Sequence, residues 1–257
     1  MNKLQRLGWH FRNELWRGLF MARRYWVEAL VGMGILFGLF GGLLFAVLSV
    51  SGKSLASGEV DGLILGFALW MFANAAFASA ATEVAEETEQ RGLEQLCLAP
   101  LPLRALLGLR TARRVLGGVL LLLLTLWLIE LLTAQRLQLH YLPTLGLALL
   151  AAPALTGVGY VLAGLLLMIK RGQMLVAAAY PLLIALVALP AYPVNSWALL
   201  PYALGAASAK ALAAGAAVPA SVWGLIALNS CFYLGLGLWL YRALEGRAKK
   251  LGVLGHL

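Results

Sequence analysis

The sequence predicts an all-α polytopic membrane protein with six transmembrane helices, and three observations lead to this prediction. The chain has 257 residues, of which 62% are hydrophobic and only 12% are charged, whereas soluble domains carry roughly 25% charged residues. Several uncharged apolar runs reach the length of about 20 residues that a transmembrane helix needs. The basic residues gather in alternate connections between these runs, as expected for a chain that crosses a membrane repeatedly. The spans use most of the length, which excludes a soluble domain of ordinary size.

Residues 1–26 predict an amphipathic helix that lies in the membrane interface. Apolar side chains recur at helical spacing from Leu4 to Leu15, and a different face carries Arg6, Arg17 and Arg24. Three tryptophans are suited to anchor it among the headgroups: Trp9, Trp16 and Trp26. The alternative is a basic segment that only sets the orientation of the chain. The segment lacks the short apolar core and small-residue cleavage site of a signal peptide.

Two spans are expected next, over residues 29–50 and 62–82. Gly34, Gly38 and Gly42 lie four apart in the first and form overlapping GxxxG patterns, which allow another helix to approach closely. That helix can belong to the same chain or to a second copy. Asn74 lies near the middle of the second span, where an interhelical hydrogen bond is favoured over contact with a substrate.

Residues 83–114 form the longest polar segment between two predicted spans, and we expect it to contain a short charged helix. Its carboxylates fall on one helical face together with Gln90: Glu83, Glu86, Glu87 and Glu94. Pro100 and Pro102 should end the helix. Two interpretations remain open. The segment is either a solvated loop, or an element that docks a soluble partner and passes force into the membrane.

The third and fourth spans are predicted over residues 115–134 and 143–169. Glu130 lies near the far end of the third, where it belongs either to a translocation path or to the hydrated interface. The fourth contains Pro153, so a kink is expected. Lys170 and Arg171 follow it as a short basic turn.

An uncharged stretch from Gly172 to Ala209 is too long for one span and contains four prolines. We therefore predict a fifth span over residues 172–189, and an irregular or re-entrant external segment over residues 191–217 that does not cross the membrane. The sixth span covers residues 219–241 and precedes a basic tail.

The positions of the basic residues predict the topology. Of the 20 Lys and Arg residues, 17 fall on one side of this arrangement and 3 on the other, the latter being Lys53, Arg136 and Lys210. Because cytoplasmic connections are rich in Lys and Arg, both termini are expected in the cytoplasm, with the chain in a bacterial inner membrane.

Motifs for chemistry are missing from the sequence. It has no G-x-x-x-x-G-K-[ST] loop for nucleotide phosphates, no H-E-x-x-H motif and no G-x-S-x-G motif. The three histidines and two cysteines are scattered and show no metal-ligand spacing. We expect neither catalysis nor a bound metal or cofactor from this chain.

The segment Glu87–Pro102, ETEQRGLEQLCLAPLP, resembles the signature of ABC-2-type transporter permeases. The residues that match that pattern are Gly92, Leu93, Glu94, Gln95, Leu96, Pro100 and Pro102. Within this family, LEQLCLAPLPL and the Lys170–Gly172 turn are similar to the haem-exporter B subunit of cytochrome c maturation. The long external segment and the tail Arg247–Leu257 depart from that branch and look more like a general exporter of drugs, lipids or glycolipids.

The resemblance implies a single transmembrane domain over residues 1–257, with a coupling helix that docks on a separate ATPase subunit. The implied docking residues are Glu86, Glu87, Glu89, Gln90, Arg91, Gly92, Leu93, Glu94, Gln95, Leu96 and Cys97. The Lys170–Arg171 turn would make a second contact. Spans two and five would line the translocation path, with Asn74, Thr82, Tyr180 and Pro181 as candidates beside Glu130.

The implied assembly is a permease homodimer with two ATPases, in which the partner holds ATP and Mg²⁺ and no nucleic acid takes part. Apolar spans favour an amphipathic or hydrophobic substrate over an ion. Two alternatives stay open. One is an ATPase-linked assembly factor that transmits force without transporting a solute, and the other is an intramembrane enzyme or channel.

Overall fold

The computed structural model describes residues 3–51, 61–89, 101–133, 141–169 and 173–251, and within these ranges every regular element is a helix. The elements are α1 (Lys3–Arg24), α2 (Trp26–Ser51), α3 (Asp61–Glu89), α5 (Leu103–Thr133), α6 (Tyr141–Leu166), α7 (Gln173–Ala188), the 3-10 helix η2 (Ser196–Leu199), α8 (Ala203–Ala213) and α9 (Ala220–Lys250).

Five of these helices, α2, α3, α5, α6 and α9, are long and apolar enough to cross a membrane. The chain is therefore an integral membrane protein. The predicted fifth span corresponds to α7, which has 16 residues and a length of roughly 24 Å, less than the ~30 Å of a hydrocarbon core. The structure thus supports five of the six predicted spans by length and composition.

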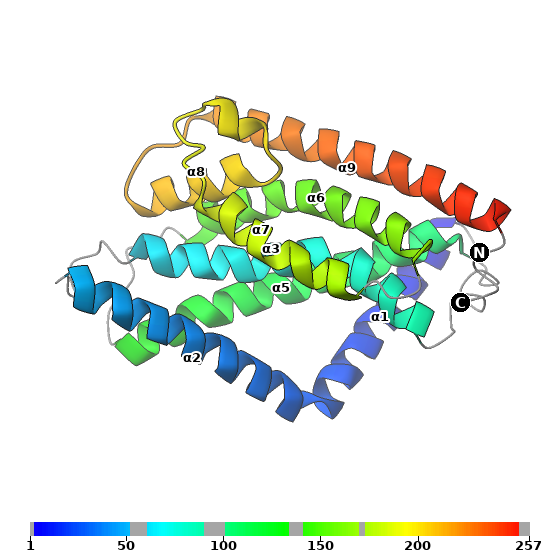
Figure 1. The fold of residues 1–257 in the computed structure, drawn as a ribbon, viewed down its shortest axis with the longest axis horizontal. Helices are drawn as coiled ribbons and strands as arrows, with labels where there is room; N and C mark the ends of the chain where they lie inside the picture. Colours follow the sequence, from blue (N-terminus) through cyan, green and yellow to red (C-terminus); the bar gives the residue numbers. More distant parts are fainter. Residues whose placement is uncertain (1–2, 52–60, 90–100, 134–140, 170–172, 252–257) are drawn as a thin grey trace.

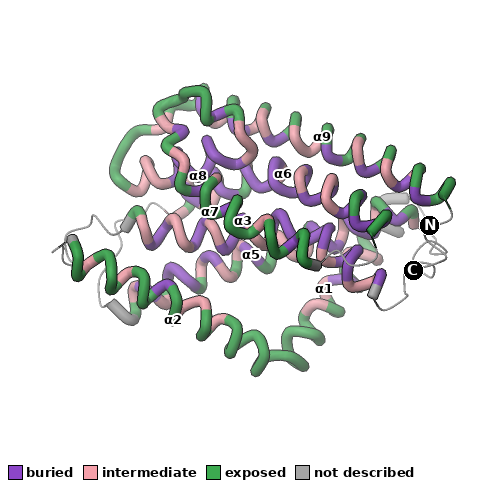
Figure 2. Tube along the Cα trace, viewed as in Figure 1, coloured by how far each residue is buried: buried purple, intermediate pink, exposed green. Residues whose placement is uncertain are grey.

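Helices α3 and α6 form the centre of the bundle. In Figure 1, α9 covers one side of α6, while α5 and α7 lie against α3. Of the most apolar part of α3, 67% is buried, whereas the corresponding part of α2 is only 6% buried. Figure 2 shows this contrast, with α2 exposed along most of its length at the edge of the molecule.

Glycines let α6 approach its neighbours closely. A Cβ atom built on Gly157 would lie 2.1 Å from the carbonyl oxygen of Tyr233 in α9, and one on Gly237 would lie 2.1 Å from that of Gly157. On another face of α6, a Cβ on Gly159 would lie 2.1 Å from the carbonyl oxygen of Phe77 in α3. The backbones of α3, α6 and α9 are therefore in direct contact, as small residues permit in membrane bundles.

The segment between α7 and α9 contains η2 and α8, and residues 202–209 of this segment are buried. Helix α8 has 11 residues, or roughly 16 Å, which is too short to cross a membrane. It packs on α3, α6 and α7. The buried Tyr202 hydroxyl, at the start of α8, donates to the carbonyl oxygen of Leu69 at 3.3 Å. In Figure 1 this segment lies at the end of the bundle opposite the C-terminal end of α9.

The helices differ from the predicted spans at their charged ends. Helix α3 continues without a break from the predicted span through Glu89, and α5 begins at Leu103, directly after Pro102. Much of the predicted 83–114 loop is therefore the end of one long helix and the start of another. Glutamate, alanine and arginine are good helix formers, so nothing in this composition stops a helix where the hydropathy falls.

Candidate functional site: a charged cluster at the ends of α3 and α5

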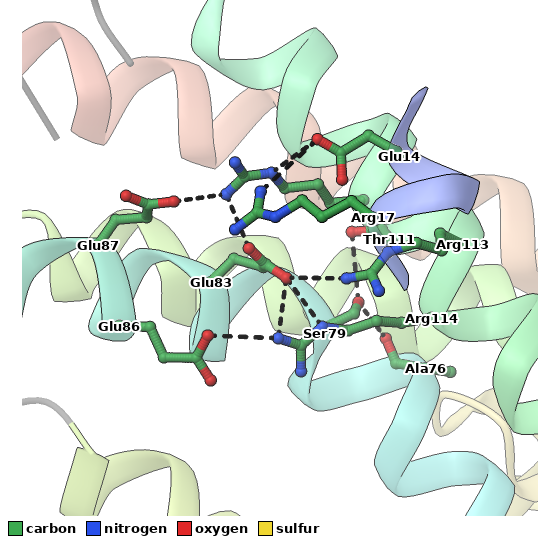
Figure 3. A network of polar contacts seen from close by, with 11 residues as sticks. Glu14, Arg17, Ala76, Ser79, Glu83, Glu86, Glu87, Thr111, Arg113 and Arg114 are labelled. Carbon is green, nitrogen blue, oxygen red and sulfur yellow. Dashed lines mark hydrogen bonds and ion pairs between the residues drawn. The ribbon is translucent and has the colours of Figure 1, made fainter. Parts of the chain in front are cut away.

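A cluster of charged side chains joins three helices at the C-terminal end of α3 (Figure 3). We call it the charged cluster, and its members are Glu14 and Arg17 from α1, Glu83, Glu86 and Glu87 from α3, and Arg110, Arg113 and Arg114 from α5.

Matching spacings in α3 and α5 bring these side chains together. The three glutamates of α3 stand at i, i+3 and i+4 from Glu83, and the three arginines of α5 at the same intervals from Arg110. Residues at these intervals share one helical face. Since α3 and α5 pack side by side, an acidic face meets a basic one.

Glu83 lies at the centre of the cluster, and only 5% of its side chain is exposed. One carboxylate oxygen accepts from the Nη1 of Arg110 at 2.8 Å. The other accepts from the Nη2 and Nε of Arg114 at 2.8 and 3.1 Å, and from the Nη2 of Arg113 at 3.5 Å. Arginine is suited to such a site because its planar group presents several donors in fixed directions.

Arg110 extends the cluster to α1 and to the last turn of α3. Its side chain is 5% exposed. The guanidinium donates to Glu87 at 2.8 Å and, through Nε, to Glu14 of α1 at 3.4 Å. Arg17 stands 3.8 Å from the same Glu14 oxygen. One buried guanidinium therefore connects α1, α3 and α5.

Packing beside the cluster is close. A Cβ on Gly18 of α1 would lie 2.8 Å from the Nη1 of Arg113, so the glycine lets α1 approach α5. One turn before Glu83, the Ser79 hydroxyl donates to the Thr111 hydroxyl at 3.3 Å. Polar contacts thus continue along the α3–α5 seam towards the apolar part of the bundle.

The charges within the cluster balance, with four glutamates and four arginines. Removing charges from water costs several kcal/mol for each ion, and only good geometry with further hydrogen bonds offsets that cost. Here Glu83 and Arg110 have both, whereas the Oε2 of Glu14 and the Nε of Arg113 are buried without a hydrogen-bond partner among the described residues. No group of His, Cys, Asp or Glu suited to a metal occurs among the described residues. The arrangement links α1, α3 and α5 through paired charges.

The structure describes only part of the predicted docking surface. Glu86 and Glu87 turn towards α5, where they contact Arg114 and Arg110. Glu86 keeps 46% of its side chain exposed, against 16% for Glu87. Glu89 closes α3. The remaining predicted docking residues 90–97, and the Lys170–Arg171 turn, lie outside the described residues.

The predicted path residues occupy three different helices. Asn74 is half-buried in α3 and donates to the carbonyl oxygen of Trp70 in its own helix at 2.9 Å. Thr82 lies further along the same helix, and Tyr180 and Pro181 are exposed on α7, which packs against α3. Glu130 accepts a hydrogen bond from the Tyr141 hydroxyl, which joins the end of α5 to the start of α6.

The predicted packing glycines of α2 have no close neighbour among the residues that the structure describes. A Cβ built on Gly34, Gly38 or Gly42 would meet nothing within 4 Å. Of the two interpretations of the GxxxG pattern, contact within one chain is therefore not seen in the described structure.

Sequence reasoning missed the role of Glu14 and treated the arginines of α5 only as a basic exit from the loop. A signal was present. Two oppositely charged triplets with the same i, i+3, i+4 spacing flank one connection, which favours pairing between the two helices that carry them.

Comparison of the chain with protein-family models, with curated proteins and with solved structures found no match.

Proposed function

We propose that this chain is the permease subunit of an ATP-binding cassette exporter, and that a separate ATPase subunit moves it through the connection between α3 and α5. The observation that carries the proposal is the charged cluster. It ties together the helix ends on both sides of residues 90–100, the segment that resembles the coupling element of ABC-2-type permeases. A force on that segment would move α3 and α5 as a unit, and α1 with them through Glu14.

Three further observations support a permease. Five helices are suited to cross the membrane. The sequence has no nucleotide-binding loop of its own, so a partner chain must bind ATP and Mg²⁺. The apolar character of α3 and α7 suits an amphipathic or hydrophobic substrate, and a homodimer of permeases with two ATPases is the assembly we propose.

The proposed topology has six spans, with α7 as the fifth, and places both termini and the charged cluster in the cytoplasm. It rests on the unequal distribution of Lys and Arg. Single cysteines at positions 53 and 250, in a background lacking Cys97 and Cys231, test it. An impermeant thiol reagent applied to intact cells should label position 53 and leave position 250 unlabelled. The reverse pattern would overturn the topology.

Docking can be tested by reversing charge at Glu94, in the proposed coupling helix. Glu87 is a poor choice because it pairs with the buried Arg110, so its reversal would disturb the fold itself. We expect Glu94→Lys to remain in the membrane but to lose the ATPase during co-purification. The matched control is Glu28→Lys, which reverses an exposed carboxylate on α2 and should retain the ATPase.

Reconstitution separates the proposal from its alternatives. The permease and its ATPase in vesicles should show ATP-dependent movement of an amphipathic compound that also stimulates hydrolysis. Coupled hydrolysis without movement of any compound would favour a force-transmitting assembly factor. Conductance or catalysis by the purified chain alone would favour a channel or an enzyme.

A further inference from the structure

A second feature lies at the end of the bundle opposite the charged cluster: an apolar groove bordered by one lysine. The groove has a volume of about 490 Å³ and runs between α2, α3 and α7. Its walls include Phe40 of α2, Phe67 and Trp70 of α3 and Val187 of α7, and Lys210 of α8 contributes the charge. This volume lies within the ~300–1,000 Å³ typical of small-molecule sites.

The groove exists because α2 touches α3 through few residues. The rings of Phe40 and Phe67 stack with centroids 4.0 Å apart, and Phe37 meets Phe67 edge-on at 6.0 Å. On the α3 side, Gly62 and Gly66 supply no side chains to fill the space, since a Cβ on either would meet nothing within 4 Å. The lining of α3 extends from Gly62 to Trp70, which is roughly 12 Å of helix.

Lys210 is held at the groove by the end of α7. Its ammonium donates to the carbonyl oxygen of Val187 at 2.6 Å, in the last turn of that helix, where carbonyl groups lack helical partners and a cation is favoured. An ammonium has three N–H donors, so this bond leaves donors available. Burial lowers the pKa of Lys210, because the charged form lacks part of its hydration.

Within the described lining of the groove, no side chain balances the charge of Lys210. Among the described residues the lining contains no carboxylate, and its other members are apolar or aromatic side chains and glycines. A half-buried cation beside apolar walls is complementary to a molecule with an anionic head and a hydrocarbon chain. The anionic head would pair with the ammonium and so compensate for the hydration that burial removes, and the chain would cover the apolar walls.

We propose that this groove binds an anionic phospholipid of the surrounding membrane, with its phosphate on Lys210 and one acyl chain between α2 and α3. Helix α2 is exposed along most of its length, which leaves the groove open to a lipid from the side. The site does not depend on the exporter function and would be occupied whether or not the chain transports a solute.

Binding can be measured by native mass spectrometry of the full chain in detergent, titrated with phosphatidylglycerol or with phosphatidylcholine of the same acyl chains. We expect the unmodified protein to bind phosphatidylglycerol about tenfold more tightly, because the choline of phosphatidylcholine is a cation that is repelled by Lys210 and offsets the charge of the phosphate that both lipids share. Glycerol 1-phosphate, which has the anion without the chain, should not compete.

Two variants test the two halves of the site. Lys210→Met should abolish the preference for phosphatidylglycerol, and Lys210→Arg should keep it. Gly66→Leu should fill the groove and weaken the binding of both lipids, since there is open space at this position. Matched controls are Lys250→Met, which removes an exposed lysine at the end of α9, and Gly224→Leu, at an exposed glycine of α9 whose Cβ would also meet nothing within 4 Å.

Equal affinity for the two lipids in the unmodified protein would overturn the proposal. So would a preference that survives Lys210→Met, or an affinity for both lipids that Gly66→Leu leaves unchanged. If Gly66→Leu instead dissociates a dimer without changing lipid binding, a second copy of the chain covers the groove and the proposal fails. Because the two variants act on different helices, misfolding of one leaves the other as a test.

Discussion

Helices α2 and α6 both carry several glycines, yet the structure uses them in opposite ways. In α6, Gly157 and Gly159 lie where any side chain would collide with the backbone of α9 or α3. In α2, Gly34, Gly38 and Gly42 face open space. Helix α6 is packed into the centre of the bundle, and α2 remains at its edge.

This contrast shows that a small-residue pattern indicates the capacity for close approach and not the partner. Lipid tails are as apolar as leucine, so helices in a membrane gain stability from packing and hydrogen bonds rather than from leaving the lipid. Helix α6 obtains that packing within the chain. Helix α2 is linked to the bundle by the Phe40–Phe67 contact and by its continuation into α1.

The largest effect is expected where α6 meets α9. Gly157→Ala places a methyl group against the backbone of Tyr233, which cannot move as a side chain can, and should cost about 3 kcal/mol or more of stability. The measurement is the temperature at which the purified protein loses its monodisperse peak in detergent. The control is Gly34→Ala in α2. Equal losses in the two variants would contradict the packing described for α6.

A loss of similar size is expected from Arg110→Met in the charged cluster. The substitution leaves Glu83 and Glu87 buried with less compensation, which costs roughly 3–5 kcal/mol when a buried pair is broken. Arg104→Met removes an exposed arginine from the same helix and should change stability by no more than about 0.5 kcal/mol. Thermal stability of both variants in detergent checks this, and comparable values would contradict the role of Arg110.

A smaller effect should follow from Glu14→Gln. The amide keeps the shape but weakens the contact with Arg110, the charged-cluster bond that ties α1 to α5. We expect a loss of about 1–2 kcal/mol, and faster protease cleavage between α1 and α2 than in the unmodified protein. Unchanged cleavage would show that other contacts are sufficient to hold α1.

The smallest effect is expected in α2. Gly38→Ala should leave the stability of the monomer unchanged or raise it by up to about 1 kcal/mol, because alanine favours a helix over glycine. Cross-linking in membranes then separates the two remaining roles of this face. Loss of a cross-linked dimer with an intact monomer would identify α2 as a dimer contact. An unchanged amount of cross-linked dimer would indicate that this face of α2 contacts lipid.

The sequence was sufficient to predict the long apolar helices, because hydropathy acts locally. The predicted end of a charged helix at Pro100 and Pro102 stays a prediction, since residues 90–100 lie outside the described residues. The sequence did not predict where α3 ends. Hydropathy falls at Glu83, but the helix continues because glutamate and alanine favour a helix, and the carboxylate of Glu83 is neutralised by Arg110, Arg113 and Arg114 of α5. That compensation comes from another helix, so it has no local signature in residues 83–89 taken alone.

The place of Lys210 was also beyond prediction from sequence. In the sequence, Lys210 is only one of three basic residues on the side of the membrane with few Lys and Arg residues. Its contact with Val187 depends on the turns that carry the chain from α7 through η2 to α8. The contacts of Gly157 and Gly159 were missed for a similar reason, because they depend on how α3 and α9 pack against α6. The sequence predicted only a kink at Pro153.

The length of α3 has a consequence for any protein that approaches this end. With 29 residues the helix is roughly 43 Å long, whereas the hydrocarbon core is ~30 Å thick. Its last turns, braced by the first turns of α5, therefore extend past the hydrocarbon core into the headgroup regions, which bring the thickness of a bilayer to ~40–45 Å. A soluble protein that approaches this end would therefore meet the charged cluster at the level of the headgroups, where its four glutamates and four arginines already balance one another.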